Sequence, residues 1–177
     1  MIIFFLLAIL ITISKTMACF SITDDNNFQN PVLNANFNLL PDVSPLTDCW
    51  TGAIRIRSDK NNWRLVANRT GPDATSANGD TSNNIKANDI SIEFELKNFG
   101  MAQADGAILV YPFSTKADLS SIESGTFLLS GIKKTGNSCS PNNPNFYQLK
   151  KSLCLFRDFV FNTGEYNAQI SYILVAP

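Results

Sequence analysis

Short runs in which apolar and polar residues alternate constrain the fold most strongly. In residues 90–97 every second residue is apolar, from Ile90 to Leu96, and polar residues fill the positions between them. This period of two is typical of a β-strand with one buried face. Further strands of this kind, some more fully buried, are predicted at residues 53–57, 63–68, 107–113, 126–132, 153–161 and 166–174.

Clusters of polar turn residues, many of them asparagines, separate these runs. Asn tolerates left-handed backbone and bonds its own main chain, so it favours turns. Residues 58–62 form such a turn between the first two runs, which predicts a hairpin. Gly71 to Asn84 is the longest polar stretch and is expected to be a surface loop of unassigned role. With no long helical stripe, the pattern predicts one antiparallel β-sandwich of about seven or eight strands, with a barrel as the alternative.

The N-terminus has the pattern of an export signal. Residues 2–13 are apolar except for Thr12, a run too short to span a bilayer. Small Ala18, with Thr16 two positions before it, suits cleavage after residue 18. We therefore expect a signal peptide at 1–18 and a single mature domain at 19–177 that does not insert in a membrane. Because Lys15 follows the apolar run and no basic residue precedes it, a retained inverted anchor is the alternative.

The cysteine content indicates disulfides. Cys19, Cys49, Cys139 and Cys154 make an even number in a chain expected to be secreted or displayed at the cell surface. Three pairings are possible. Their spacing favours Cys19–Cys49 and Cys139–Cys154, which close loops of about 31 and 16 residues. Lipidation of Cys19 after leader cleavage is the alternative, but it would leave an odd cysteine.

Composition excludes several classes of function. The chain contains no histidine, which excludes Ser-His-Asp and Cys-His catalysis and every metal site that needs an imidazole. Its formal net charge of -1 provides no field that would attract nucleic acid. We expect no cofactor and no catalytic site.

Carboxylates are the remaining candidates for chemistry. Glu93 and Glu95 share a strand face about 7 Å apart, a separation that a glycosidase pair could use. Since the opposite face is the apolar one, a solvated surface is the favoured interpretation. Asp24-Asp25 and the loop from Asp73 to Asp80 offer oxygen atoms to calcium, but polar turns have the same composition.

A second set of residues could contact a ligand. Arg55 and Arg57 share a strand face, and Arg64 is expected on the partner strand of the hairpin, so that the three would form a basic stripe. Trp50 and Trp63, with Tyr111 and Tyr147, could stack on sugar rings if they were exposed in a row. Burial of the tryptophans near a disulfide is the favoured alternative.

The two ends of the mature chain resemble exported pilin-like domains. Cys19, Cys49 and the closing Gly164-Glu165-Tyr166 strand are similar to the spore coat protein U-like and chaperone–usher pilin group. This resemblance implies an immunoglobulin-like sandwich in which an early disulfide ties the first strand to the second. The sequence departs from that group because no alternating extension precedes Cys19 after cleavage. A second resemblance rests on one tripeptide. Trp63-Arg64-Leu65 is similar to the Trp-x-Leu motif of wall-binding surface domains.

Together these patterns predict a non-enzymatic surface module with a structural or adhesive role, such as a pilus- or coat-associated subunit. Its expected partners are other surface or coat proteins, contacted through sheet edges and loops, or a glycan. The alternatives are a secreted carbohydrate-binding module and, less favoured, a hydrolase that uses carboxylates.

Overall fold

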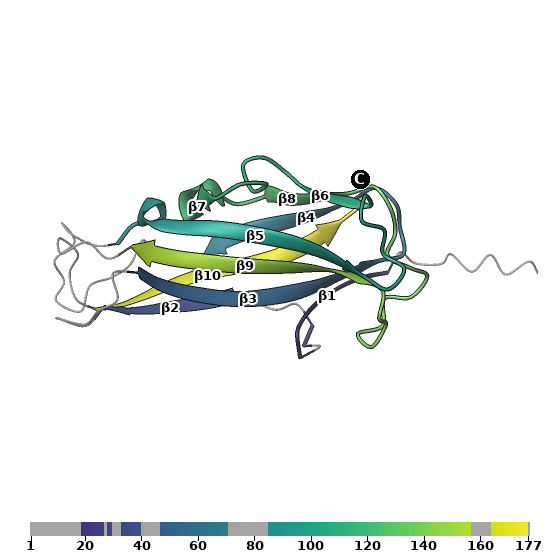
Figure 1. Ribbon diagram of the computed structural model, residues 1–177, viewed down its shortest axis with the longest axis horizontal. Coiled ribbons are helices and arrows are strands. Elements are labelled where there is room, and N and C mark those ends of the chain that lie inside the picture. Colours follow the sequence, from purple (N-terminus) through teal and green to yellow (C-terminus); the bar gives the residue numbers. More distant parts are fainter. Residues whose placement is uncertain are drawn as a thin grey trace, which may run out of the picture.

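The protein is an all-β sandwich. The computed structural model describes residues 19–26, 28–29, 33–39, 47–70, 85–156 and 164–176. Within them, two five-stranded antiparallel sheets lie face to face (Figure 1). In spatial order, sheet A contains β1 (Phe20–Asp24), β3 (Thr47–Ser58), β9 (Phe146–Phe156), β5 (Ile90–Phe99) and β7 (Ala117–Asp118). Sheet B contains β2 (Leu33–Leu39), β10 (Gly164–Val175), β4 (Trp63–Thr70), β8 (Thr126–Gly131) and β6 (Ala107–Leu109).

The predicted sandwich is thus confirmed, and each predicted run overlaps a strand. The described residues contain ten strands rather than the seven or eight expected, because β1, β2 and β7 were not predicted. Two short 3₁₀ turns, η1 (Ala87–Asp89) and η2 (Leu119–Ser121), are the helices in the described residues. The leader at 1–18, the loop Gly71 to Asn84 and residues 157–161 of the predicted 153–161 strand lie outside the described residues.

Alternation in each strand directs apolar side chains into the space between the sheets. Ile54 and Leu149 of sheet A are 0% exposed, as are Leu65 and Ile170 of sheet B. Burying an aliphatic side chain of this size contributes about 1.5–3 kcal/mol. The inner faces of two sheets therefore form one continuous core.

The predicted hairpin of residues 53–57 and 63–68 is wrong. β3 pairs with β1 and β9, whereas β4 pairs with β10 and β8, so the turn at Asp59–Asn62 crosses from sheet A to sheet B. Asn62, with φ 56°, provides the left-handed residue of this turn. Alternation reports which face of a strand is buried but not which strand lies beside it, and that explains the error.

The predicted disulfide pairing is also wrong. Cys49 bonds Cys154, and Cys19 bonds Cys139. Cys49 and Cys154 are directly opposed on β3 and β9, with Cα atoms 4.1 Å apart. The bonds separate 105 and 120 sequence positions, so each removes about 5 kcal/mol of chain entropy from the unfolded state in the loop-closure model. Sequence proximity had favoured the short loops, but the pairing of β3 with β9 brings Cys49 and Cys154 together.

Two short strands, β1 in sheet A and β2 in sheet B, each cover only part of the longer strand beside them. β1 pairs with β3 only from Ile54 to Ser58, and β2 pairs with β10 only from Gly164 to Ile170. Among the described residues, none pairs with the outer edge of β3 from Thr47 to Ala53. None pairs with the edge of β10 opposite β4 from Ser171 to Val175 either. We call these two segments the open half-edges.

Candidate binding surfaces

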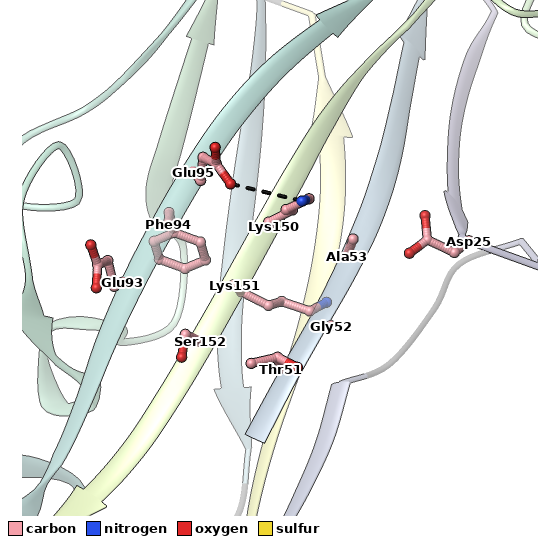
Figure 2. A pocket seen from close by; sticks show the side chains of 10 residues that line it. All are labelled: Asp25, Thr51, Gly52, Ala53, Glu93, Phe94, Glu95, Lys150, Lys151 and Ser152. Atoms are coloured by element: carbon pink, nitrogen blue, oxygen red, sulfur yellow. Dashed lines mark ion pairs between the residues drawn. The ribbon is translucent and has the colours of Figure 1, made fainter. Parts of the chain in front are cut away.

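A shallow hollow lies on the outer face of sheet A (Figure 2). Its volume is about 870 Å³. Cross-strand register places Glu93, Ser152 and Thr51 in one row across β5, β9 and β3. The next row contains Glu95, Lys150 and Ala53. The small side chains of β3 and β9 leave the hollow between the glutamates of β5 and Asp25. Its other lining residues are Gly52, Phe94 and Lys151.

Glu93 and Glu95 lie along the hollow, and Glu95 lacks the environment of a general acid. Both are exposed, which confirms the predicted solvated face. Lys97 Nζ lies 2.9 Å from Glu95 and Lys150 Nζ lies 3.9 Å from it. The hydrogen bond from Lys97 lowers the pKa of Glu95. A general acid needs a raised pKa, so this environment favours a permanently ionised carboxylate.

The expected basic stripe of Arg55, Arg57 and Arg64 does not form, because β3 and β4 belong to different sheets. Arg55 Nε lies 3.4 Å from an Asp25 carboxylate oxygen. Arg64 is exposed on sheet B, on the other side of the sandwich. The three guanidinium groups therefore cannot contact one ligand together.

Arg57 is a structural residue and is only 1% exposed. Its guanidinium donates hydrogen bonds to the carbonyl oxygens of Asn143 (3.0 Å) and Pro141 (2.7 Å) and to Thr23 Oγ1 (3.1 Å). Burial lowers its pKa, with a smaller effect from Arg55. Arg57 thus fastens the loop before β9 to the face of sheet A, and no ligand can reach it.

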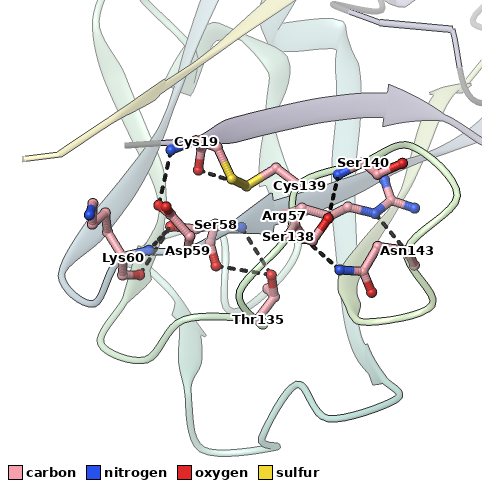
Figure 3. Close-up of a disulfide and its surroundings, with 10 residues drawn as sticks. All are labelled: Cys19, Arg57, Ser58, Asp59, Lys60, Thr135, Ser138, Cys139, Ser140 and Asn143. Atoms are coloured by element: carbon pink, nitrogen blue, oxygen red, sulfur yellow. Dashed lines mark hydrogen bonds between the residues drawn. A yellow bond between two sulfur atoms is a disulfide. The ribbon is translucent and has the colours of Figure 1, made fainter. Parts of the chain in front are cut away.

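The same loop is joined to the start of β1 by the Cys19–Cys139 disulfide (Figure 3). Asp59 Oδ1 accepts a hydrogen bond of 3.0 Å from the backbone nitrogen of Cys19. Thr135 donates to the Ser58 carbonyl oxygen at 3.1 Å and accepts from the Ser58 N–H at 3.0 Å. These bonds fix the first described residues against the β3–β4 turn.

The aromatic candidates do not form an exposed row. Trp63 is 0% exposed, and its Nε1 donates to the Lys133 carbonyl oxygen at 3.0 Å. Its ring centroid lies 5.8 Å from that of Tyr147, which is 1% exposed. Trp50 is half-buried and packs against the core, whereas Tyr111 is 83% exposed. Trp63 is therefore a core residue, as the favoured alternative held, and cannot contact a ligand.

Asp24 and Asp25 have protein partners. Asp24 Oδ1 accepts from the backbone nitrogens of Asn26 (2.9 Å) and Phe28 (2.8 Å), and Asp25 Oδ1 accepts from Gln148 (3.1 Å). These bonds are typical of a polar turn. The second part of the calcium hypothesis, Asp73 to Asp80, lies outside the described residues.

Sequence reasoning missed the charged residue inside the core. Lys151 lies on the inner face of β9 and is 5% exposed. Its Nζ is 4.8 Å from the centroid of the Tyr172 ring and 6.0 Å from that of Trp50. Desolvation lowers its pKa to about 8. The alternation could have revealed this burial, since Lys151 lies two residues from the apolar Leu149 and Leu153 and therefore on the same strand face.

Within the described residues, no helix is long and apolar enough to cross a membrane. The two disulfides indicate an oxidising, extracytoplasmic environment. No protein-family model matches the chain, and neither a curated protein nor a solved structure shows significant similarity to it.

Proposed function

We propose that the protein is an exported structural or adhesion module of the cell surface that binds other surface or coat proteins through strand edges and loops. The observation that carries this proposal is the partial cover that β1 and β2 give to β3 and β10. This partial cover leaves the open half-edges of β3 and β10 without a partner among the described residues. The resemblance to pilin-like domains favours the same class of function, although the Cys19–Cys139 bond differs from the early disulfide that it implied.

Export is supported by three features. The apolar leader precedes Ala18, the four cysteines form two disulfides, and Asp59 accepts a hydrogen bond from the Cys19 nitrogen. Cleavage after Ala18 would turn that nitrogen into an ammonium group facing a carboxylate, and such a bond is roughly twice as strong as a neutral one. The disulfide of Cys19 also leaves no thiol for a lipid.

The mechanism that we propose is strand addition. An extended segment of a partner placed against Thr47–Ala53 would continue sheet A, and one placed against Ser171–Val175 would continue sheet B. Each main-chain hydrogen bond gained contributes about 0.5–1.5 kcal/mol net. Long strands with unpaired edges are the usual template for such pairing.

A photo-crosslinking amino acid placed at Thr51 or Ser171 in the secreting cells tests this mechanism. Ser152 is the matched control, because it lies directly opposite Thr51 on the same outer face but on β9, which is paired on both sides. We expect crosslinks to surface proteins at one or both edge positions and none at Ser152. Thr51→Lys or Ser171→Lys should then abolish the corresponding complex. No crosslinks at either edge, or equal crosslinking at Ser152, would contradict the proposal.

Glycan binding is a second candidate, favoured by the polar hollow of sheet A. Carboxylate, hydroxyl and ammonium groups line it together, and these are groups that hydrogen-bond sugar hydroxyls. A glycan array that gives equal signals for the wild-type protein and the double variant Glu93→Gln, Ser152→Ala would exclude this hollow as the site.

A further inference from the structure

The outer face of sheet B carries a group of apolar side chains that are exposed or half-buried. Ile108 is 61% exposed, Phe127 44% and Ile173 51%. Register makes Ile173, Val66 and Phe127 direct neighbours across β10, β4 and β8. We call the group Val66, Ile108, Phe127, Ile173 and Val175 the apolar face. Exposed apolar residues scattered singly are normal, but a contiguous group on one face marks an interaction site.

One cation lies within this group. Arg64 is exposed on β4 between Val175 and Ser130, and its Cζ is 4.9 Å from the centroid of the Phe127 ring. Stacking on the ring holds the guanidinium against the sheet, and no carboxylate in the described part of the chain pairs with it. Its hydrogen-bond donors are therefore available to an incoming acceptor. Arg and aromatic residues are also enriched at the centres of protein interfaces.

The outer face of sheet A is built differently. There Glu95 pairs with Lys97 and Lys150, and Arg55 pairs with Asp25, so charges of both signs compensate one another. That pattern suits a face in permanent contact with water. The apolar face has a single uncompensated charge instead, which points to compensation by a partner.

We propose that the apolar face binds a protein segment whose apolar side chains surround a carboxylate that pairs with Arg64. Two copies of this face would bring one Arg64 against another, which disfavours self-association through it. A single arginine contributes too little to hold the face on an anionic membrane. Stacking of a sugar ring on Phe127 is disfavoured because Arg64 already covers that ring.

Ile173 and Val175 belong both to this surface and to the open half-edge of β10, but Arg64 lies on β4, which is paired on both sides. The inference therefore goes beyond the proposed function, and Arg64→Gln tests it separately from strand addition. The test uses the disulfide-intact protein and a phage-displayed library of random peptides. Selected peptides are then made synthetically and titrated by fluorescence polarisation. The variants are Arg64→Gln and Ile173→Ser, with Lys97→Gln, an exposed cation on the opposite sheet, as the control.

We expect the selected peptides to carry Asp or Glu next to apolar residues. Arg64→Gln should weaken binding about tenfold or more, since a hydrogen bond to a charged group contributes that much. Ile173→Ser should weaken it similarly, and Lys97→Gln should leave it unchanged. Replacing the peptide's acid by its amide should remove the dependence on Arg64. Failure to select a peptide, selection of peptides without acids, or binding insensitive to Arg64→Gln would overturn the proposal.

Discussion

The buried Lys151 gives the clearest prediction about stability, because placing an ammonium group in an apolar core costs free energy. The lowered pKa of about 8, against 10.5 in water, corresponds to about 3 kcal/mol at about 1.4 kcal/mol for each tenfold change in proton affinity. Stacking over Tyr172 and Trp50 returns about 0.5–2 kcal/mol. Lys151→Met, which replaces the lysine by an uncharged and slightly shorter unbranched side chain, should therefore stabilise the protein at pH 7 by about 1–3 kcal/mol.

The dependence on pH follows from the same pKa. Below pH 8 the lysine is protonated in both the folded and the unfolded state, so the full cost of burial is present. Between pH 8 and 10.5 the unfolded state binds more protons than the folded state, and the free energy of unfolding therefore rises with pH. Burial raises the pKa of Tyr147 and Tyr172, which lowers stability at still higher pH in both proteins. The difference between wild type and Lys151→Met removes this common contribution.

Urea unfolding followed by far-UV circular dichroism, repeated from pH 7 to 10.5, measures the effect. The advantage of Lys151→Met should shrink steadily to nothing or reverse slightly over this range. Lys150→Met is the control, since Lys150 is exposed on the other face of the same strand and should change stability by less than about 0.5 kcal/mol. If Lys151→Met is destabilising at pH 7, or if its advantage does not change with pH, the ammonium group is not buried as described.

Three further predictions concern packing, the loop that Arg57 holds and the backbone nitrogen of Cys19. Gly131→Ala should destabilise by about 1–3 kcal/mol by urea unfolding, because a Cβ there meets the buried Trp63 ring; an unchanged midpoint would contradict this packing. Arg57→Ala should cost about 2–4 kcal/mol and speed amide hydrogen exchange in residues 137–145, because the Pro141 and Asn143 carbonyl oxygens lose their donor. Exchange at the wild-type rate would mean that other contacts hold the loop. Asp59→Asn should cost about 1 kcal/mol more in a chain that begins at Cys19 than in one that keeps the leader, since only the former has an ammonium group there; equal unfolding free energies would argue against that ion pair.

The alternating runs predicted seven of the ten strands in the described residues, because alternation reports burial directly, but they did not predict β1, β2 and β7. Residues 90–97 fall within β5, and the exposure of Glu93 and Glu95 follows from the same parity. Pairing was not predictable in this way. β3 lies beside β9, about a hundred residues later in the chain, and both the hairpin and the disulfide errors come from preferring neighbours in sequence.

The candidate sites show the same limit. Parity correctly placed Arg57 on the outer face of sheet A, but it could not show that the loop containing Pro141 and Asn143 covers it. The apolar face could not be predicted either, because it combines residues from four strands whose neighbours the sequence does not specify. The burial of Lys151, in contrast, could have been predicted, since its position in the alternation places it on the apolar face of the strand.

We propose above that this chain is exported, and the structure is a sandwich with two disulfides. The most direct measurement is the intact mass of the protein recovered from its host, before and after reduction and alkylation, with mapping of the linked peptides. We expect a mass that begins at Cys19, alkylation of four thiols only after reduction, and peptides that join Cys19 to Cys139 and Cys49 to Cys154. Free thiols before reduction, a lipid on Cys19 or a retained leader would contradict this expectation.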